Sequence, residues 1–442
     1  MGGVGRRLWV VAGVGLVAWY CLAVGNRAWG QVDFEGEPFR YHTAETDNPI
    51  ARLQRGLESG EVSLDYEPGT GYLRSLLKAL QIDTASQTLV FSKTSFQFRK
   101  ISPDNPRALY FNDDTYIGWV PGGEVIEVST VDPRLGAIFY TFPQARTEQP
   151  RFERDKGQCL TCHATSRTQG VPGHVVRSVY ADATGQPVYQ WGTFNTDDHS
   201  PFVERWGGWY VTGTHGSMRH MGNQTLTAGA TPQSVDLDRG ANRVQLDDQI
   251  DTSVYLEPTS DIVALMVLEH QAQMHNVLAK AHYDVGMALH YNSIMNEALK
   301  RPADYQSESV ERRIVSAADR VLKSLLFVGE FQLTSPVSGS SKFAERFAGR
   351  GAQVGGRGSL REFDLQHRLF RYPCSYLIDS PAFAQLPPAV HQRVIRDLQQ
   401  VLSGENKSAD FSGLSVEDRA ALRELLGPKL TAVQPAASDL AQ

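Results

Sequence analysis

Five consecutive residues, Cys159-Leu160-Thr161-Cys162-His163, are the part of the sequence best suited to chemistry. Two thiols three positions apart, with a histidine directly after them, are the attachment signature of a c-type haem. Cys159 and Cys162 would each form a thioether with one haem vinyl group, and His163 would ligate the iron as the proximal ligand. The motif occurs once in the chain. It therefore predicts a single haem c, covalently attached, with its iron.

Other uses of this motif are weaker. A zinc site needs two further cysteines or histidines at short spacing. The pairs His215/His220 and His270/His275 have suitable internal spacing, but both lie much further from Cys162 than the roughly 12–15 residues usual in zinc motifs. The polar flanks do not predict the strand and helix of a thioredoxin-like pair, and a disulfide across two residues would be strained. Haem attachment is the preferred interpretation, and zinc stays open.

The second axial ligand of the iron is sought first in residues 214–221. A low-spin electron carrier commonly has Met or His on the distal face of the haem, and Met raises the potential. This segment offers His215, Met218, His220 and Met221. A methionine ligand would indicate a carrier of higher potential, and a histidine ligand would indicate bis-histidine ligation and a lower one. The sequence does not choose among the four.

A weaker pair of distal candidates lies on the helix expected at 261–300. His270 and Met274 are four residues apart and share one helix face. Each also has an ordinary structural interpretation, the methionine as a core side chain and the histidine as the partner of a neighbouring Glu. A third alternative is an open distal face with no ligand from the protein.

The charged and sulfur-bearing residues narrow the class of protein. The net charge of −6 argues against nucleic acid as a partner, because phosphate binding rests on a basic surface. Four cysteines in 442 residues exclude a disulfide scaffold. Cys374 lies in an apolar run and is expected to be a buried, inert thiol. Asp197-Asp198 is expected to be solvated, and Arg205 and Arg219 are candidates to bind the haem propionates.

The first 30 residues have the pattern of an export signal. Arg6-Arg7 is a short basic region, Leu8–Gly25 is an uninterrupted apolar run, and Ala28-Trp29-Gly30 offers a cleavage site. The apolar run has a length between those of a cleaved signal and a membrane anchor. Residues 1–30 are therefore predicted to be a signal peptide, or an anchor to the inner membrane through residues 8–25. Either alternative places the body of the chain in the periplasm or elsewhere outside the cytoplasm.

The spacing of apolar residues predicts an α+β fold, with a strand-rich N-terminal and haem-bearing part and a helical C-terminal part. Short alternating runs rich in β-branched and aromatic residues predict antiparallel strands at 88–92, 108–111, 116–120, 124–128 and 137–142. Helical spacing predicts helices at 261–300, 311–327, 388–402 and 415–427, with Asp261 as the N-cap of the first. The expected regions are 31–150 (mixed, strand-rich), 151–235 (haem attachment), 236–428 (helical, with an exposed loop at 336–360) and 429–442 (disordered tail).

Five stretches spread over most of the chain carry a family resemblance: Ser86–Ser95, Arg107–Asp113, Arg205–Gly216, Leu268–Gln271 and Arg371–Ile378. In these stretches the chain resembles a group of large exported bacterial proteins described as cytochrome c domain-containing. The resemblance implies that Cys159 and Cys162 are the thioether sites and that His163 is an axial ligand. Small soluble cytochromes are mostly helical and carry the motif near the N-terminus, whereas strands are expected on both sides of it here. The ordinary helical cytochrome fold is therefore not expected.

Together these observations predict an exported mono-haem c-type cytochrome that carries out single-electron transfer. Its expected partners are redox proteins of the periplasm or the membrane. The chain is several times larger than electron carrying alone requires, so two alternatives stay open. One is a haem enzyme, such as a peroxidase or small-molecule oxidoreductase, with an open distal site. The other is a haem-based sensor with the same open site.

Overall fold

The computed structural model of the protein describes residues 33–227, 229–354 and 356–430. The chain divides into two units, Met1–Asp33 and Phe34–Gln442, and nearly all of the first lies outside the described residues. The predicted export signal and residues 431–442 of the predicted tail lie outside them as well. The strand-rich and the helical parts both belong to the second unit.

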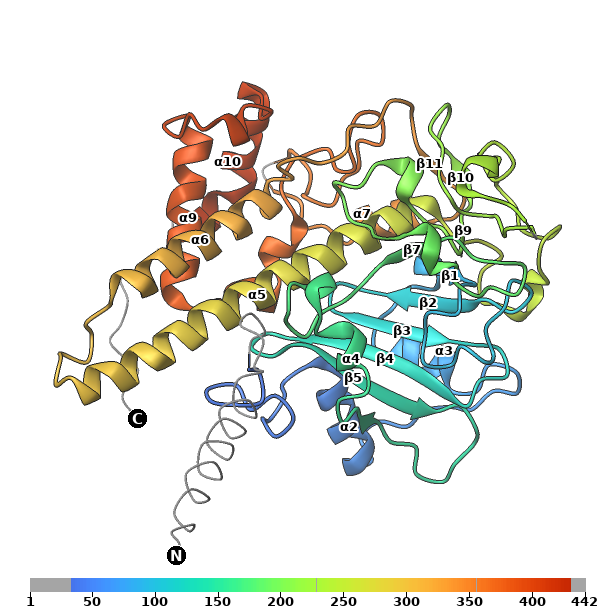
Figure 1. The fold of residues 1–442 in the computed structure, drawn as a ribbon, viewed down its shortest axis with the longest axis horizontal. Helices are drawn as coiled ribbons and strands as arrows, with labels where there is room; N and C mark the ends of the chain where they lie inside the picture. The colour runs from blue at the N-terminus through green and yellow to red at the C-terminus, as the bar shows by residue number, and fades with distance from the viewer. Residues whose placement is uncertain (1–32, 228, 355, 431–442) are drawn as a thin grey trace, which may run out of the picture. The chain divides into compact units, whose positions relative to one another are not determined.

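A seven-stranded antiparallel sheet forms the centre of the strand-rich part (Figure 1). Its strands lie side by side in the order β6-β5-β4-β3-β2-β1-β9. Their bounds are β1 Thr88–Val90, β2 Arg107–Phe111, β3 Thr115–Trp119, β4 Val125–Asp132, β5 Gly136–Pro143, β6 Glu153–Arg154 and β9 Trp209–Tyr210. The five predicted strands correspond to β1–β5. Gly122, at φ 68°, supplies the left-handed conformation for the turn between β3 and β4.

Different helices cover the two faces of this sheet. α2 (Pro49–Ser59) and α3 (Leu73–Ala79) cover one face, where the side-chain amide of Asn48 donates to the Tyr140 hydroxyl on β5 (3.1 Å). The long helix α5 (Ile262–Ala298) crosses the other face, where Nδ1 of His275 hydrogen bonds with the Tyr116 hydroxyl on β3 (2.9 Å). The predicted haem motif lies on this second face, on the short helix α4 (Leu160–His163).

The helical part is built along α5. Asp261 caps this helix, its carboxylate accepting the N–H groups of Val263 and Ala264, as the sequence predicts. α6 packs along α5, α9 packs against α6, and α10 packs against α9 (Figure 1). The bounds are α6 Glu308–Leu325, α7 Phe343–Gly349, α8 Pro381–Ala384, α9 Pro388–Ser403 and α10 Val416–Leu430. None of the helices in the described part of the chain combines the length and the apolarity needed to cross a membrane.

The α+β prediction is confirmed, with differences of detail. The expected exposed loop at 336–360 contains β11 (Ser338–Gly339), which pairs with β10 (Gly213–Thr214), and all of α7. Phe343 and Phe347 of α7 lie one turn apart and are both buried, so two aromatic anchors order a segment rich in Gly and Ser. A second two-stranded sheet pairs β7 (Arg177–Val179) with β8 (Thr193–Asn195). Residues 429–430, expected in the tail, complete α10.

Candidate functional site

The Cys159–His163 motif forms a single helical turn that presents two free thiols. The carboxylate of Asp155 accepts the backbone N–H groups of Gly157 (2.8 Å) and Cys159 (3.0 Å), which fixes the loop entering the turn. Leu160 is buried, while the thiol of Cys159 is half-buried and that of Cys162 is exposed. Burial, reinforced by the carboxylate of Asp155, raises the pKa of the Cys159 thiol to about 12. Both cysteines are free of disulfide bonds, and the Cys159 thiol is protonated at neutral pH.

His163 is held at two points by Gly173. Its Nδ1 hydrogen bonds with the Gly173 carbonyl (3.0 Å), and the Gly173 N–H donates to the His163 carbonyl (2.9 Å). Nε2 has no hydrogen-bond partner among the residues that the structure describes. Burial lowers the pKa of His163, and the nearby Arg107 guanidinium acts in the same direction, so the ring is neutral at neutral pH. A neutral imidazole with Nδ1–H on a backbone carbonyl and Nε2 free is the form that ligates a metal.

Side chains on one face of the central sheet pack against the motif and against His174. Tyr116, Ser129 and Phe139 are cross-strand neighbours on β3, β4 and β5, so their side chains share one face. The Phe139 ring packs on the His163 ring, with centroids 4.7 Å apart. Next to it, His174 hydrogen bonds through Nε2 with Ser129 (2.7 Å) and stacks on Tyr116 at 4.3 Å between centroids. This row fixes the direction in which the His163 ring faces.

An ion pair lies on the same face of the sheet. Arg107 pairs with Glu127, and Glu127 also accepts hydrogen bonds from Ser95 (2.8 Å) and Gln97 (3.2 Å). Glu127 acts electrostatically on the Cys159 thiol and Arg107 acts on the His163 ring, so the pair contributes to the field at the motif.

The donor set fits a c-type haem. Two free thiols at the required spacing and one neutral, singly tethered histidine lie on one turn. Bound there, a haem would supply reversible one-electron chemistry at its iron. Cys159 and Cys162 would tether it, and His163 would ligate it.

Residues 214–221, the first source of distal candidates, lie at a different place in the fold. The N–H of Ile262 donates to the Thr212 carbonyl, which ties this segment to the beginning of α5. The motif instead meets α5 at Asn276, through hydrogen bonds to residue 174. At 1.5 Å per residue, about 20 Å of helix separate these two points of α5. The structure does not bring the two sets of residues together.

The side chains of this segment are also engaged locally. Nδ1 of His215 donates to the Met218 carbonyl (2.8 Å), and its Nε2 accepts the Asn242 N–H (3.0 Å), so both ring nitrogens are in use. His220 packs between the His215 and Trp206 rings, and burial lowers its pKa to about 3. The sulfur of Met221 accepts the Ser178 hydroxyl at 3.7 Å, and Met218 belongs to the hydrophobic core. These contacts describe a packed interior.

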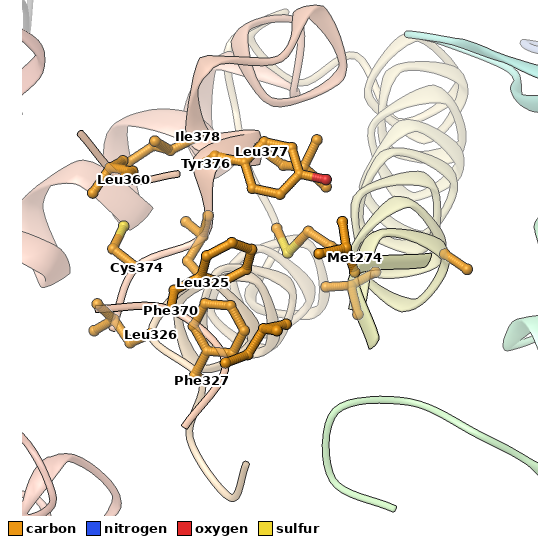
Figure 2. Close-up of a cluster of buried hydrophobic side chains, with 14 of the residues drawn as sticks. Met274, Leu325, Leu326, Phe327, Leu360, Phe370, Cys374, Tyr376, Leu377 and Ile378 are labelled. Carbon is orange, nitrogen blue, oxygen red and sulfur yellow. The ribbon is translucent and has the colours of Figure 1, made fainter. Parts of the chain in front are cut away.

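His270 and Met274, the weaker candidates, face the helical core. Met274 is fully buried in an apolar cluster that also contains Phe327, Phe370 and the thiol of Cys374 (Figure 2). Burial raises the pKa of Cys374 to about 12. The expectation that the Cys374 thiol is buried is confirmed.

His270 takes part in an arrangement that sequence reasoning missed. Its Nε2 hydrogen bonds with the Ser375 hydroxyl (2.8 Å) and its Nδ1 with the Asp198 carboxylate (3.0 Å), as in a Ser-His-Asp catalytic triad. Ser375 is completely buried, however, and its N–H donates to the Leu325 carbonyl (2.8 Å) instead of forming an oxyanion hole. A nucleophile needs access to substrate, so the arrangement is a structural one.

Two expectations about charged residues are corrected by this same region. Asp198, expected to be solvated, is buried and accepts a hydrogen bond from His270. Hydrogen bonds from His199 and His270 lower its pKa against the effect of burial. Arg205, a propionate candidate, is buried in an ion pair with Glu269 (2.9 Å). Arg219 pairs with Asp238. Asp197, Asp198 and His199 are the one group within the described residues whose geometry would suit a metal ion, but their atoms already pair with one another and with His270.

Comparisons with family models, with curated proteins and with solved structures find no match for this chain. The functional interpretation therefore rests on the geometry of the motif. Sequence reasoning found the three motif residues but missed Gly173 and Phe139, which contact His163, and Arg107, which acts on it electrostatically. Only Gly173 left a local signal, as the glycine of a Pro-Gly turn ten residues after His163.

Proposed function

We propose that this protein is an exported mono-haem c-type cytochrome that transfers single electrons. The observation that carries the proposal is the state of His163. Its Nδ1 is bound to the Gly173 carbonyl and its Nε2 is unbonded, directly beside two accessible free thiols. His215 and His270, by contrast, have both ring nitrogens bonded and lie away from any thiol pair.

The residues around the motif have distinct roles in this proposal. Cys159 and Cys162 hold the group covalently, which suits a protein that leaves the cytoplasm. Phe139 packs on the His163 ring and Gly173 binds its Nδ1, and these contacts leave Nε2 available to a ligand. The exposed thiol of Cys162 indicates that one edge of the bound group would be open to partners, which we propose are redox proteins of the periplasm or the membrane.

A second candidate function is a haem enzyme or sensor with an open distal face. It is favoured by the placement of the predicted distal ligands. Thr212, just before residues 215–221, bonds to the start of α5 about 20 Å along the helix from Asn276. His215 and His270 have both ring nitrogens in use. Within the described residues, neither predicted source supplies a ligand opposite His163.

One set of absorption spectra tests both functions. The chain would be produced in cells with haem-maturation machinery, and the exported protein would be measured oxidised, reduced, and reduced with carbon monoxide. Covalent haem with a low-spin reduced spectrum that carbon monoxide does not change would support electron transfer. A high-spin spectrum that shifts with carbon monoxide would support the enzyme or sensor instead. Zinc without haem in the purified protein would contradict both.

A further inference from the structure

The peptide group between Gly173 and His174 is bonded on both sides. Its carbonyl oxygen meets Nδ1 of His163 at 3.0 Å, and its N–H donates to Oδ1 of Asn276 on α5 at 2.8 Å. The side-chain amide of Asn276 also donates to the His174 carbonyl (2.7 Å). One asparagine of the long helix therefore reaches the proximal histidine through a single peptide group.

This contact is buried and has little freedom to relax. Asn276 is 2% exposed and His174 is 7% exposed. A Cβ atom at Gly173 would lie 2.2 Å from Oδ1 of Asn276 and 2.9 Å from Cβ of Thr168, so the backbone approaches the asparagine as closely as only glycine permits. The acceptor of the His163 hydrogen bond is thus fixed relative to α5, and not only to its own loop.

We infer that Asn276 is a positioning residue that sets the donor strength of His163 toward the iron. The inference rests on the proposed function. Hydrogen bonds in series polarise one another, so an N–H bound to Asn276 makes the carbonyl of the same peptide a stronger acceptor. A stronger bond to Nδ1–H makes the imidazole a more basic ligand. A more basic ligand stabilises oxidised iron, and Asn276 therefore lowers the reduction potential.

Two substitutions at this position separate polarisation from simple support. Asn276→Leu keeps the size of the side chain and removes both hydrogen bonds, so the potential rises. Asn276→Asp keeps an acceptor for the His174 N–H and makes it anionic, and charged acceptors form stronger hydrogen bonds, so at pH 8 the potential falls. For Asn276→Leu we expect at least a threefold change in the reduction equilibrium, about 28 mV at 59 mV per tenfold change for one electron.

The matched control is Asn296→Leu. Asn296 is also a buried asparagine of α5 that binds a backbone carbonyl, that of Tyr305 (2.8 Å), but it lies about 30 Å further along the helix. Its loss perturbs the helix without touching the motif. The potential of this variant should equal that of the unsubstituted protein.

The test is a spectroscopic redox titration of the purified exported proteins, with the covalent haem content measured first. Absence of covalent haem from the unsubstituted protein would overturn the proposed function, and this inference with it. With haem present, opposite shifts for Asn276→Leu and Asn276→Asp support the inference. Unchanged potentials, or shifts in the same direction for both variants, would overturn it while leaving the proposed function standing. If Asn276→Leu does not fold, Asn276→Ala removes the same two hydrogen bonds in its place, and an unchanged potential in that variant overturns the inference.

Discussion

His163 and His270 show how differently one fold can use a histidine. Both rings are neighbours of an aromatic side chain, Phe139 at 4.7 Å for His163 and Phe327 at 4.3 Å for His270. Both ring nitrogens of His270 form hydrogen bonds, one with Asp198 and one with Ser375, in the buried core. Only Nδ1 of His163 forms a hydrogen bond, with a backbone carbonyl. The residue lies on the partly exposed turn that carries the two thiols.

The difference teaches that an open turn beside two thiols, more than the number of free ring nitrogens, sets His163 apart, because the buried His174 also leaves its Nδ1 unbonded. His270 has the partners of a catalytic triad and no access for a substrate. His163 has few partners, and its Nε2 forms no hydrogen bond with the described residues. The comparison therefore gives the motif a role in binding and gives the His270 network a role in stability. Substitution of each histidine tests these two roles.

The largest expected effect is on the bound haem. His163→Ala should abolish axial ligation by this residue and change the reduced absorption spectrum, because the variant lacks the ring whose Nε2 is unbonded. His270→Ala should leave the spectrum unchanged. Absorption spectra of the two exported variants, normalised to haem content, check this. Equal spectral changes in both variants would erase the distinction drawn here.

The next effect is on stability, where the order of the two histidines should reverse. His270→Ala leaves the buried Asp198 carboxylate and the buried Ser375 hydroxyl without this partner, and a buried polar group that loses its hydrogen bond costs about 1–3 kcal/mol. His163→Ala in the haem-free chain removes one hydrogen bond, worth about 0.5–1.5 kcal/mol. Urea unfolding of both haem-free variants gives the two free energies. A greater loss for His163→Ala would mean that the motif histidine is structural.

A smaller effect concerns residues 215–221, which the structure presents as interior. Burial lowers the pKa of His220 to about 3, whereas an unfolded histidine titrates near 6.5. The unfolded chain therefore binds more protons below pH 6.5, and this group makes stability fall as the pH falls. Between pH 7 and pH 5 the loss should be about 2 kcal/mol smaller in His220→Phe than in the unsubstituted chain. Equal losses of unfolding free energy in the two chains, measured by urea titration at both pH values, would show that His220 is protonated in the folded state.

The smallest effect concerns the thiols. In the haem-free chain Cys162 should be alkylated readily because it is exposed, and Cys374 should not react until the chain unfolds. Cys159 should react slowly at pH 7 and faster as the pH rises, because its pKa is raised to about 12 and the thiolate is the nucleophile. Asp155→Asn should speed this reaction. Mass spectrometry of peptides after timed alkylation measures all three rates.

Much of the fold can be predicted from the local spacing of apolar residues and from helix-capping residues. Strands β1–β5 follow from alternating aromatic and β-branched residues, and α5 begins at the predicted cap, Asp261. α7 was missed because two phenylalanines order a segment whose Gly and Ser content predicts a loop. Burial between distant segments decides such cases, and a single sequence does not display it.

The site divides in the same way. The two thiols and His163 share one pentapeptide, so their chemistry is visible in the sequence. The residues that hold His163, above all Asn276 and Phe139, come from other elements more than 20 positions away, and their roles depend on tertiary packing. The distal candidates were chosen by residue type, which carries no information on whether a ring nitrogen is already bonded.

The most direct test of the central claim is the intact mass of the exported protein after denaturation, compared with that of the Cys159→Ala/Cys162→Ala double variant. The unsubstituted chain should carry the added mass of one haem that denaturant does not remove, and the double variant should carry none. A bare chain in both samples, made under conditions in which a control cytochrome is matured, would contradict the assignment of Cys159–His163 as a haem site.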